Sequence, residues 1–369
     1  MNWDSMTSTS TTTTTTTTSS STMLMTTKTE KKKTTPEQIG LAQAALERAH
    51  QLIRSAQRPL LICHISPDGD AIGSMVGLGR ALRQRGLSPI LACSDPISPA
   101  FSYIPGIEGI VGKIEDADSF DLVITLDSSD MERLGHFPNV PGFRDVPLLN
   151  IDHHATNLDF GDANLVDRAA SSTAEIVLQL LETMAAPLDA DIATALLTGI
   201  VGDTRGFRTN NVTPQVLEAA LRLMKAGASL PNVARHTLDT RPTAAIRLWG
   251  EALARLQCQG RVIWTSIPLA ARRAVGYTGD GDASLVSFLI SAEDADAAAV
   301  FTEREGDRIE VGLRARPGFD VAQVALQLGG GGHALAAGCT LPGPLEEAQT
   351  RLLAVLKASL AEQRTKREM

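Results

Sequence analysis

Three apolar runs in this sequence end in, or are followed by, aspartate or histidine, and this pattern constrains the fold more than any other feature. The runs PLLICHI (59–65), FDLVITL (120–126) and VPLLNI (146–151) are continuous rather than alternating. Continuous apolar runs of this length are typical of strands buried on both faces of a parallel sheet. We therefore expect an α/β fold whose mostly parallel sheet carries helices on both faces, with a ligand site beyond the carboxyl ends of the strands.

The chain of 369 residues is long enough for two domains, each with its own core. Helical spacing marks 37–56, 70–86 and much of 171–227, and SPILAC (88–93) is another candidate strand. A second unit follows, with the strand RVIWTSIP, a strand pair AAAVFTE and RIEVGLRAR, and the helix DVAQVALQL before GGGGH. We expect a disordered Thr/Ser-rich tail over 1–35, a first domain over 36–227, a linker over 228–256 and a smaller α/β domain over 257–369 across a cleft.

The tail is of low complexity and has no apolar segment to pack, so we expect neither structure nor a secretory signal there. It is either a true extension or lies upstream of a start at Met23 or Met25.

Charge and composition exclude two classes of partner. The formal net charge of −8 argues against a broad basic face for duplex DNA. No run of about 18 apolar residues occurs, so we expect no membrane-spanning helix. The four cysteines (Cys63, Cys93, Cys258 and Cys339) form no CxxC pair, and we expect reduced thiols in a cytoplasmic protein in preference to disulfides.

The candidate ligand residues fall at four places along the chain. They are His64, Asp68 and Asp70 after the first run, Asp127 after the second, Asp152, His153 and His154 after the third, and Asp203 in GIVGDTRGF. Carboxylates gathered this closely repel one another unless cations lie between them. The set predicts two divalent ions, and carboxylate with imidazole but no thiolate favours Mn²⁺, or otherwise Fe²⁺, Co²⁺ or Mg²⁺. Two such ions suit an in-line phosphoryl displacement.

A simpler interpretation exists for each residue alone. A single aspartate at a strand end is more often a helix cap or turn residue, and this alternative stays open for Asp152. An isolated histidine is more often a packing or surface residue than a ligand. Four such places in one chain make the metal interpretation the stronger one.

The same motifs resemble a known family. HISPDGDAIGS, LDSSD, IDHHATN and GDTRGF are similar, in this order, to the four motifs of the DHH phosphoesterase superfamily. VGLRARPGFDVAQVALQLGGGGHALAAGC resembles the DHHA1 domain that accompanies it, and the resemblance extends over about 45–345. The greatest similarity is to the cytoplasmic group that hydrolyses oligoribonucleotides and 3′-phosphoadenosine 5′-phosphate. RecJ exonucleases are more distant, because they are larger and carry an additional nucleic-acid-binding domain.

The resemblance implies a role for each matching residue. His64, Asp68 and Asp127 would bind a first metal. Asp70, Asp127, His153 and Asp203 would bind a second, with Asp127 bridging. His154 would point toward the substrate phosphate as charge stabiliser or proton donor, and Asp152 would orient the two histidines. In the second domain, substrate contacts would come from Arg314, Gly330, Gly331, Gly332 and His333.

Three features of the resemblance leave alternatives open. Relatives often have Asp-Thr-Gly where this chain inserts Arg205, which contacts either the substrate phosphate or solvent. A glycine-rich stretch lets backbone N–H groups approach an anion, but by itself it is more often a flexible loop. Arg316 is a weaker candidate than Arg314, with a solvated position favoured.

We expect a two-metal phosphodiesterase that acts on short single-stranded RNA, on linear dinucleotides such as pApA, and as a further candidate on 3′-phosphoadenosine 5′-phosphate. Two alternatives are an inorganic pyrophosphatase or exopolyphosphatase, and a non-catalytic nucleotide sensor. Cleavage of cyclic di-AMP stays open. On resemblance alone we expect a homodimer through the first domain, and no duplex DNA or membrane as partner.

Overall fold

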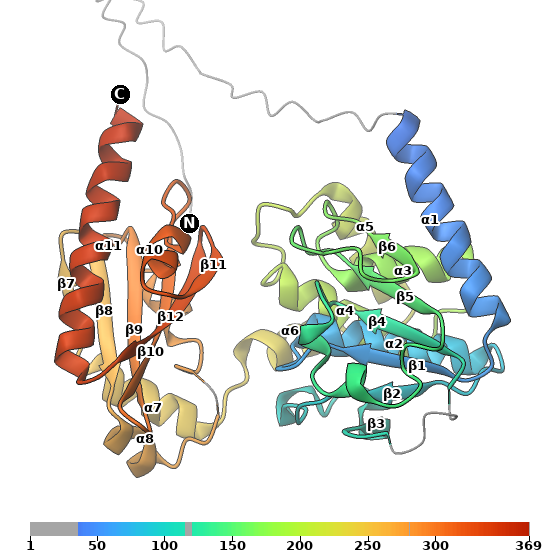
Figure 1. Ribbon diagram of the computed structural model, residues 1–369, viewed down its shortest axis with the longest axis horizontal. Coiled ribbons are helices and arrows are strands. Elements are labelled where there is room, and N and C mark those ends of the chain that lie inside the picture. Colours follow the sequence, from blue (N-terminus) through green and yellow to red (C-terminus); the bar gives the residue numbers. More distant parts are fainter. Residues whose placement is uncertain (1–35, 115–119, 280, 369) are drawn as a thin grey trace, which may run out of the picture.

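The computed structural model describes residues 36–114, 120–279 and 281–368, which form two lobes joined by a helical connection (Figure 1). The predicted disordered tail over 1–35 lies outside the described residues. Each lobe is built around its own six-stranded sheet. Within the described ranges, no helix is long and apolar enough to span a membrane.

The first lobe contains an all-parallel sheet with the strand order β3-β2-β1-β4-β5-β6, which confirms the predicted parallel sheet. Its strands are β1 (Pro59–Cys63), β2 (Ile90–Ala92), β3 (Ile110–Val111), β4 (Leu122–Leu126), β5 (Leu148–Asp152) and β6 (Ala163–Val166). The strand order reverses between β1 and β4. Open α/β sheets bind ligands at such a switch point, beyond the carboxyl ends of the strands.

The two faces of this sheet are covered differently. Long helices share one core on the first face: α1 (Pro36–Ser55), α2 (Gly69–Gln84), α3 (Thr173–Thr183), α4 (Ala190–Asp203) and α5 (Pro214–Lys225). On the second face, Leu134 and Phe137 from the 3₁₀ helices η4 (Glu132–Leu134) and η5 (Phe137–Asn139) pack against Leu60 and Ile62. The segment GHFPNVPG over 135–142 contains two prolines and two glycines, which prevent a longer helix there.

Helices α2 and α4 approach each other closely because glycine lies at their contact. A Cβ atom at Gly73 would overlap the carbonyl oxygen of Ala195, and one at Gly199 would overlap the carboxylate of Asp70. This approach brings the start of α2, with Asp70, close to the end of α4, where Asp203 is the last residue.

The stretch over 228–256, predicted as a linker, is itself helical. It contains α6 (Leu230–Ala234), the π-helix η6 (Arg235–Asp239) and α7 (Thr243–Leu253). Val233 of α6 belongs to the core of the first lobe, whereas Leu248 and Ala252 of α7 pack with the second. The predicted domain bounds stay a proposal.

The second lobe holds a mixed sheet with the strand order β11-β12-β10-β9-β8-β7, in which β8 and β9 are parallel and the other pairs antiparallel. Its strands are β7 (Gln257–Gln259), β8 (Val262–Ile267), β9 (Ala297–Arg304), β10 (Arg308–Ala315), β11 (Gly331–His333) and β12 (Ala336–Pro342). The predicted strand pair around REGD is confirmed as β9 and β10. The helices are α8 (Leu269–Val275), α9 (Leu285–Leu289), α10 (Ala322–Gln327) and α11 (Leu345–Glu368).

All four cysteines are free thiols, as predicted. Cys63, Cys93 and Cys339 are buried, and Cys258 is exposed. The three buried thiols therefore contribute to packing, and none of the four cysteines forms a covalent cross-link.

Candidate metal centre

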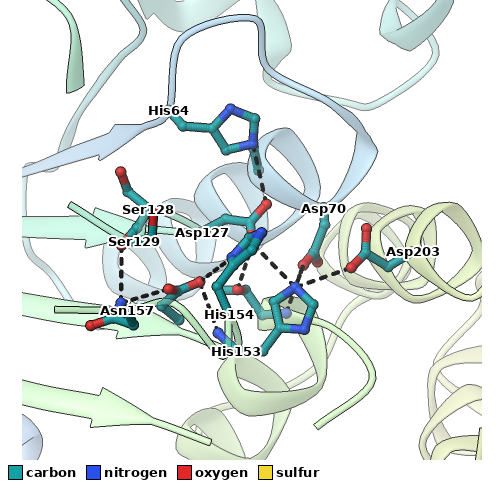
Figure 2. A network of polar contacts seen from close by, with 12 residues as sticks. His64, Asp70, Asp127, Ser128, Ser129, His153, His154, Asn157 and Asp203 are labelled. Carbon is teal, nitrogen blue, oxygen red and sulfur yellow. Dashed lines mark hydrogen bonds and ion pairs between the residues drawn. The ribbon is translucent and has the colours of Figure 1, made fainter. Parts of the chain in front are cut away.

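Histidine and aspartate side chains from three neighbouring strands meet at the carboxyl edge of the first sheet (Figure 2). His64 follows β1, Asp127 follows β4, and Asp152 is the last residue of β5 before the two histidines. Two further acids, Asp70 and Asp203, come from α2 and α4. Their ligand atoms form three groups, each within 4.8 Å: His64, Asp68 and Asp127; Asp70, His153 and Asp203; Asp127, His153 and His154. All of the predicted metal ligands, together with His154, thus lie in one cluster.

His64 presents a free ring nitrogen to this cluster. Its Nδ1 lies 2.7 Å from the carbonyl oxygen of Ile65, which can only accept, so the proton is on Nδ1. The other nitrogen, Nε2, lies 3.4 Å from Asp127 Oδ2 and 3.9 Å from Asp68 Oδ1. A neutral imidazole held in this tautomer is the form that ligates a metal.

The position of Asp68 is compatible with both helix capping and metal binding. As the N-cap of α2, its Oδ1 accepts hydrogen bonds from the backbone N–H groups of Asp70 and Ala71. Its side chain remains 57% exposed, so one carboxylate oxygen is free to face the cluster or solvent. Sequence reasoning treats capping and metal binding as alternatives, but here they are compatible.

Asp127 lies at the centre of the cluster and belongs to two of the three groups. Its backbone has a φ of 60°, in the left-handed region that aspartate tolerates better than most residues. Burial alone would raise the pKa of the Asp127 carboxyl, but the three neighbouring histidines outweigh it and hold that pKa well below its ordinary value. The carboxylate is therefore charged and available to two ions at once.

Asp70 is fully buried at the first turn of α2. Its carboxylate accepts hydrogen bonds from the backbone N–H groups of Thr173 (2.6 Å) and Ala174 (2.9 Å), at the start of α3. Burial, followed by the charges of Asp127 and Asp203, nevertheless raises its pKa well above the usual value. A divalent cation would remove this repulsion and restore the charged carboxylate.

His153 gives the clearest test of whether this cluster fits a cation. Its Nε2 lies 3.1 Å from Asp203 Oδ2, 3.6 Å from Asp127 Oδ1 and 3.9 Å from Asp70 Oδ2. None of these contacts has hydrogen-bond geometry, so the buried nitrogen has no hydrogen-bond partner. Burial opposes charge on this ring, but the carboxylates of Asp203, Asp70 and Asp127 outweigh it and raise its pKa to about 10. A nitrogen aimed at three carboxylates without bonding any of them fits a shared cation.

His154 differs from its neighbour because it is bound to one carboxylate. Its Nδ1 lies 2.7 Å from Asp152 Oδ1, a contact that raises the pKa of His154. Asp152 is fully buried and also accepts from the backbone N–H of His153 and from Asn157 Nδ2. Asp152 thus holds both histidines and makes no direct contribution to the three groups.

Two polar residues of this centre were missed by sequence reasoning. The hydroxyl of Thr173 donates to Asp127 Oδ1 at 2.9 Å, from the first residue of α3. The amide of Asn157 donates to Asn150 Oδ1 and Asp152 Oδ2, and both asparagines are buried. In the sequence, Asn157 follows DHH in the segment DHHATN, and Thr173 ends the segment SST at the start of a helical run. The spacing of neither residue indicates a contact with the predicted metal ligands.

Two of the predicted substrate residues of the second lobe, Arg314 and His333, lie on one face of its sheet. Arg314 pairs in register with Ala336, which pairs with His333, so the three side chains share a face. Arg314 Nη1 donates to the carbonyl oxygen of Leu313, but its buried Nε has no partner. The glycine run is partly a strand, since Gly331 and Gly332 pair with β12.

The two remaining arginines have different surroundings. Arg205 is exposed and has a φ of 48°. Burial lowers the pKa of Arg314, and the charge of the nearby Arg205 lowers it further. Both arginines therefore face the space between the lobes. Arg316 instead donates from Nη2 to the carbonyl oxygen of Ala292 at 2.6 Å, within its own lobe.

Two family models match this chain. The DHH family N-terminal domain matches residues 59–200, and the DHHA1 domain matches residues 268–362. These matches confirm the resemblance on which the residue roles were predicted.

Proteins with curated names are similar over most of the chain. It is 35% identical over 315 residues to the bifunctional oligoribonuclease and PAP phosphatase NrnA of Thermus thermophilus, covering 84% of this chain and 93% of that protein. It is 27% identical over 284 residues to the protein of the same name from Bacillus subtilis, covering 75% and 87%. Among solved structures, an exopolyphosphatase-related protein from Bacteroides fragilis matches with a TM-score of 0.79 at 22% identity, over 89% of this chain and 98% of that one. This last match shows a shared fold.

Proposed function

This chain belongs to the DHH family and carries a DHHA1 domain, and on this premise we propose that it is a two-metal phosphoesterase. Its substrates are short oligoribonucleotides and linear dinucleotides such as pApA, and 3′-phosphoadenosine 5′-phosphate is a further one. The names of the relatives from Thermus thermophilus and Bacillus subtilis support both activities.

The observation that carries the proposal is the unbonded Nε2 of His153 among three carboxylates. One divalent ion would be held by His64, Asp68 and Asp127, and another by Asp70, Asp127, His153 and Asp203. The ligand set contains carboxylate and imidazole but no thiolate, which favours Mn²⁺ over a structural zinc and leaves Mg²⁺, Fe²⁺ and Co²⁺ as alternatives. When bound, such ions supply the positive charge that activates water and neutralises charge on a phosphoryl group.

The protein's own contribution to the reaction begins with His154. Because Nδ1 bonds to Asp152, Nε2 is the ring atom that remains free to donate to a phosphate oxygen or to the leaving oxygen. The contact with Asp152 raises the pKa of His154, which favours the protonated ring that a donor needs. Asp152 acts as a positioning residue, since it is buried behind the histidine and holds the ring orientation.

Residues of the second lobe would bind the far end of the substrate. Arg314 has a buried Nε donor without a partner, and Arg205 adds positive charge from the first lobe. A phosphate placed between them would satisfy the donor and remove the repulsion between the two guanidinium groups. His333 and the backbone of Gly331 and Gly332 would supply further donors, whereas the N–H of Gly330 already donates to the carbonyl oxygen of Ala325 at 2.8 Å. A binding lobe at a fixed place relative to the metals would limit substrates to a few nucleotides.

A turnover panel tests this function. The protein is stripped of metal, then supplied with Mn²⁺ or Mg²⁺, and incubated with pApA, a trinucleotide, 3′-phosphoadenosine 5′-phosphate, pyrophosphate and polyphosphate. We expect hydrolysis of the nucleotides and less than a tenth of it in Asp127→Ala. Faster turnover of pyrophosphate or polyphosphate would favour the pyrophosphatase alternative. Tight nucleotide binding without hydrolysis would favour a sensor.

Three further expectations belong to the same proposal. The net charge of −8 supports a substrate preference for short single strands over duplex DNA. Free thiols support a reducing cytoplasm. A homodimer is a prediction that size-exclusion chromatography with light scattering can test, and the exposed apolar stripe of Leu217, Leu221 and Met224 on α5 is a candidate contact.

A further inference from the structure

One face of the second sheet presents its residues as three rows that run across the strands. The first row is Ala298, Arg314, Ala336 and His333, in register from β9 to β11. The second is Val300, Gly312, Gly338 and Gly331. The third is Thr302, Glu310 and Thr340. Because opposed residues of neighbouring strands point to the same face, cationic donors, bare backbone and polar side chains follow one another in that order.

The three consecutive glycines of the second row leave backbone without side chains across three strands. None of them has a positive φ, so their conformations do not require glycine. Packing restricts only one of the three: a Cβ at Gly338 would lie 3.0 Å from the carbonyl oxygen of Val311, whereas one at Gly331 would meet nothing within 4 Å and one at Gly312 would make only ordinary contacts of 3.5 Å or more. Glycine is also disfavoured inside strands, where it costs stability. At Gly312 and Gly331 the surface is therefore kept flat for a reason other than packing.

A cavity of about 440 Å³ lies over this flat surface. Gly312 and Gly338 form its floor, Gly281 and Asp282 line one side, and Gly329 and Gly330 line another. Its far end is formed by the third row, Thr302, Glu310 and Thr340. The volume falls within the range of small-molecule pockets, and the floor is open to a planar ring that can contact peptide groups over its whole area.

Charge orders this groove from one end to the other. Arg314 lies one row beyond the lining of the cavity, on the side of the first lobe, because it interacts electrostatically with Arg205 of that lobe and with Asp282 of the cavity wall. At the opposite end, Glu310 is held by Arg304, with 2.7 Å between Arg304 Nη2 and Glu310 Oε2. A ligand that matches this order has a phosphate, then a flat ring, then a hydrogen-bond donor.

We propose that this groove holds the nucleobase of the nucleotide whose phosphate lies at Arg314, with the base flat against the glycine row and its amino edge at Glu310. The inference rests on the proposed function and extends it to base recognition. Glu310 can only accept, so it favours a base that offers an exocyclic amino group, such as adenine, over one that offers a carbonyl there. Thr302 and Thr340 can donate to a ring nitrogen beside that amino group.

The floor is tested by filling it. Gly312→Val places an isopropyl group above the floor, close to Val286, whose Cγ1 lies 3.5 Å from the Cβ position. Gly312→Ala is the second variant, because its single methyl group makes only ordinary contacts there and the fold should be kept. It should raise KM for pApA in the same direction. Gly109→Val is the matched control, since Gly109 lies in the first lobe with nothing within 4 Å of its Cβ position. We expect KM for pApA to rise about tenfold in Gly312→Val and to stay at the wild-type value in Gly109→Val.

The base itself is tested with analogues of pApA that each lack one of the two bases. In the wild type, one analogue should show a KM about tenfold higher than pApA, and Gly312→Val should abolish that difference. An unchanged KM for pApA in Gly312→Val would overturn the inference. So would a rise in KM caused by Gly312→Val that is the same for pApA and for both base-lacking analogues.

A binding measurement separates this inference from the proposed function. If the wild type hydrolyses no nucleotide, the function fails. Titration of the protein with AMP and with ribose 5-phosphate still reports on the groove. A preference for AMP that Gly312→Val removes supports the groove, and equal affinities overturn it.

The contact between the amino edge of the base and Glu310 is tested with Glu310→Gln. The matched control is Arg304→Gln, which breaks the same ion pair but keeps the carboxylate of Glu310. We expect Glu310→Gln to lose most of the preference for AMP over IMP and Arg304→Gln to keep it. A preference that survives in Glu310→Gln would contradict the assignment of this residue.

Discussion

Nδ1 of His154 lies 2.7 Å from Oδ1 of Asp152, whereas the adjacent His153 has no hydrogen-bond partner at its buried Nε2. Two histidines that are neighbours in the chain therefore have different chemistry. The first is aimed at three carboxylates, as a metal ligand would be. The second is held by one carboxylate that raises its pKa, as a proton donor would be.

Asp152→Asn tests the positioning of His154. The carboxylate raises the pKa of His154, so its removal lowers that pKa. A donor is active below its pKa, so we expect the falling limb of the pH–rate profile to move to lower pH, with turnover at pH 8 about 10-fold to 100-fold lower. Asp159→Asn, a variant of an exposed residue in the following loop, serves as control.

An outcome in which Asp152→Asn loses activity equally at every pH would assign Asp152 a purely structural role. The pH profile therefore distinguishes the two roles where a single activity value would not.

Metal binding should release protons. In the metal-free protein the pKa of His153 is about 10, so its ring is charged at neutral pH and must lose a proton to bind an ion. Affinity for Mn²⁺ should therefore rise with pH between 6 and 9. Calorimetric titrations in buffers with different ionisation enthalpies measure the protons released, and a value of zero at pH 7 would contradict the assignment of His153.

The same shift has a consequence for stability without metal. The pKa of His153 is raised above its unfolded value of about 6.5. Its stabilising contribution is thus fully present below about pH 6.5 and is lost as pH rises through about 10. Urea unfolding of metal-free wild type and His153→Gln should show a difference in unfolding free energy that shrinks over this pH range. A constant difference would be evidence against the charged histidine.

The contact between α2 and α4 should tolerate no extra methyl group. Gly73→Ala places a Cβ against the carbonyl oxygen of Ala195, so we expect the free energy of unfolding to fall by about 1–3 kcal/mol. Activity should fall as well, because this helix contact positions Asp70 and Asp203. Gly250→Ala is the matched control in α7, where nothing lies within 4 Å. In Gly250→Ala the free energy of unfolding should rise by up to about 1 kcal/mol, because alanine is a better helix former than glycine. Equal effects in the two variants would argue against the close approach.

Arg205→Gly tests whether this arginine binds substrate. Glycine adopts a φ near 48° without cost, so thermal stability should not fall. If Arg205 contacts the substrate phosphate, its loss should raise KM for the substrate about tenfold and make substrate binding less dependent on salt concentration. The control is Arg144→Ala, at an exposed position of the first lobe. A KM within twofold of wild type would leave Arg205 as a solvent-facing residue.

The arrangement of the metal centre was predictable because strand ends are easy to recognise. Buried parallel strands have continuous apolar sequences, so the first polar residues after them mark one edge of the sheet. His64, Asp127 and His153 could be assigned to that edge without knowledge of the strand order. Thr173 could not, because it reaches Asp127 only through the packing of α3, which has no signal in local spacing.

The second lobe was less predictable for a related reason. Glycine and alanine are both depleted in strands, and alanine favours helices, so the strand pair formed by Gly331–His333 and Ala336–Pro342 was not recognised. These strands form because β10 offers β12 an antiparallel partner over its whole length. The flat glycine row depends on this register and is invisible in the sequence alone.

The central claim is that the cluster around Asp127 holds two divalent ions. Crystals grown with Mn²⁺ and measured at the manganese absorption edge test it directly. We expect two anomalous peaks, one among His64, Asp68 and Asp127 and the other among Asp70, His153 and Asp203, with Asp127 contacting both. The absence of any peak in the cluster, or peaks only elsewhere in the molecule, would contradict the account.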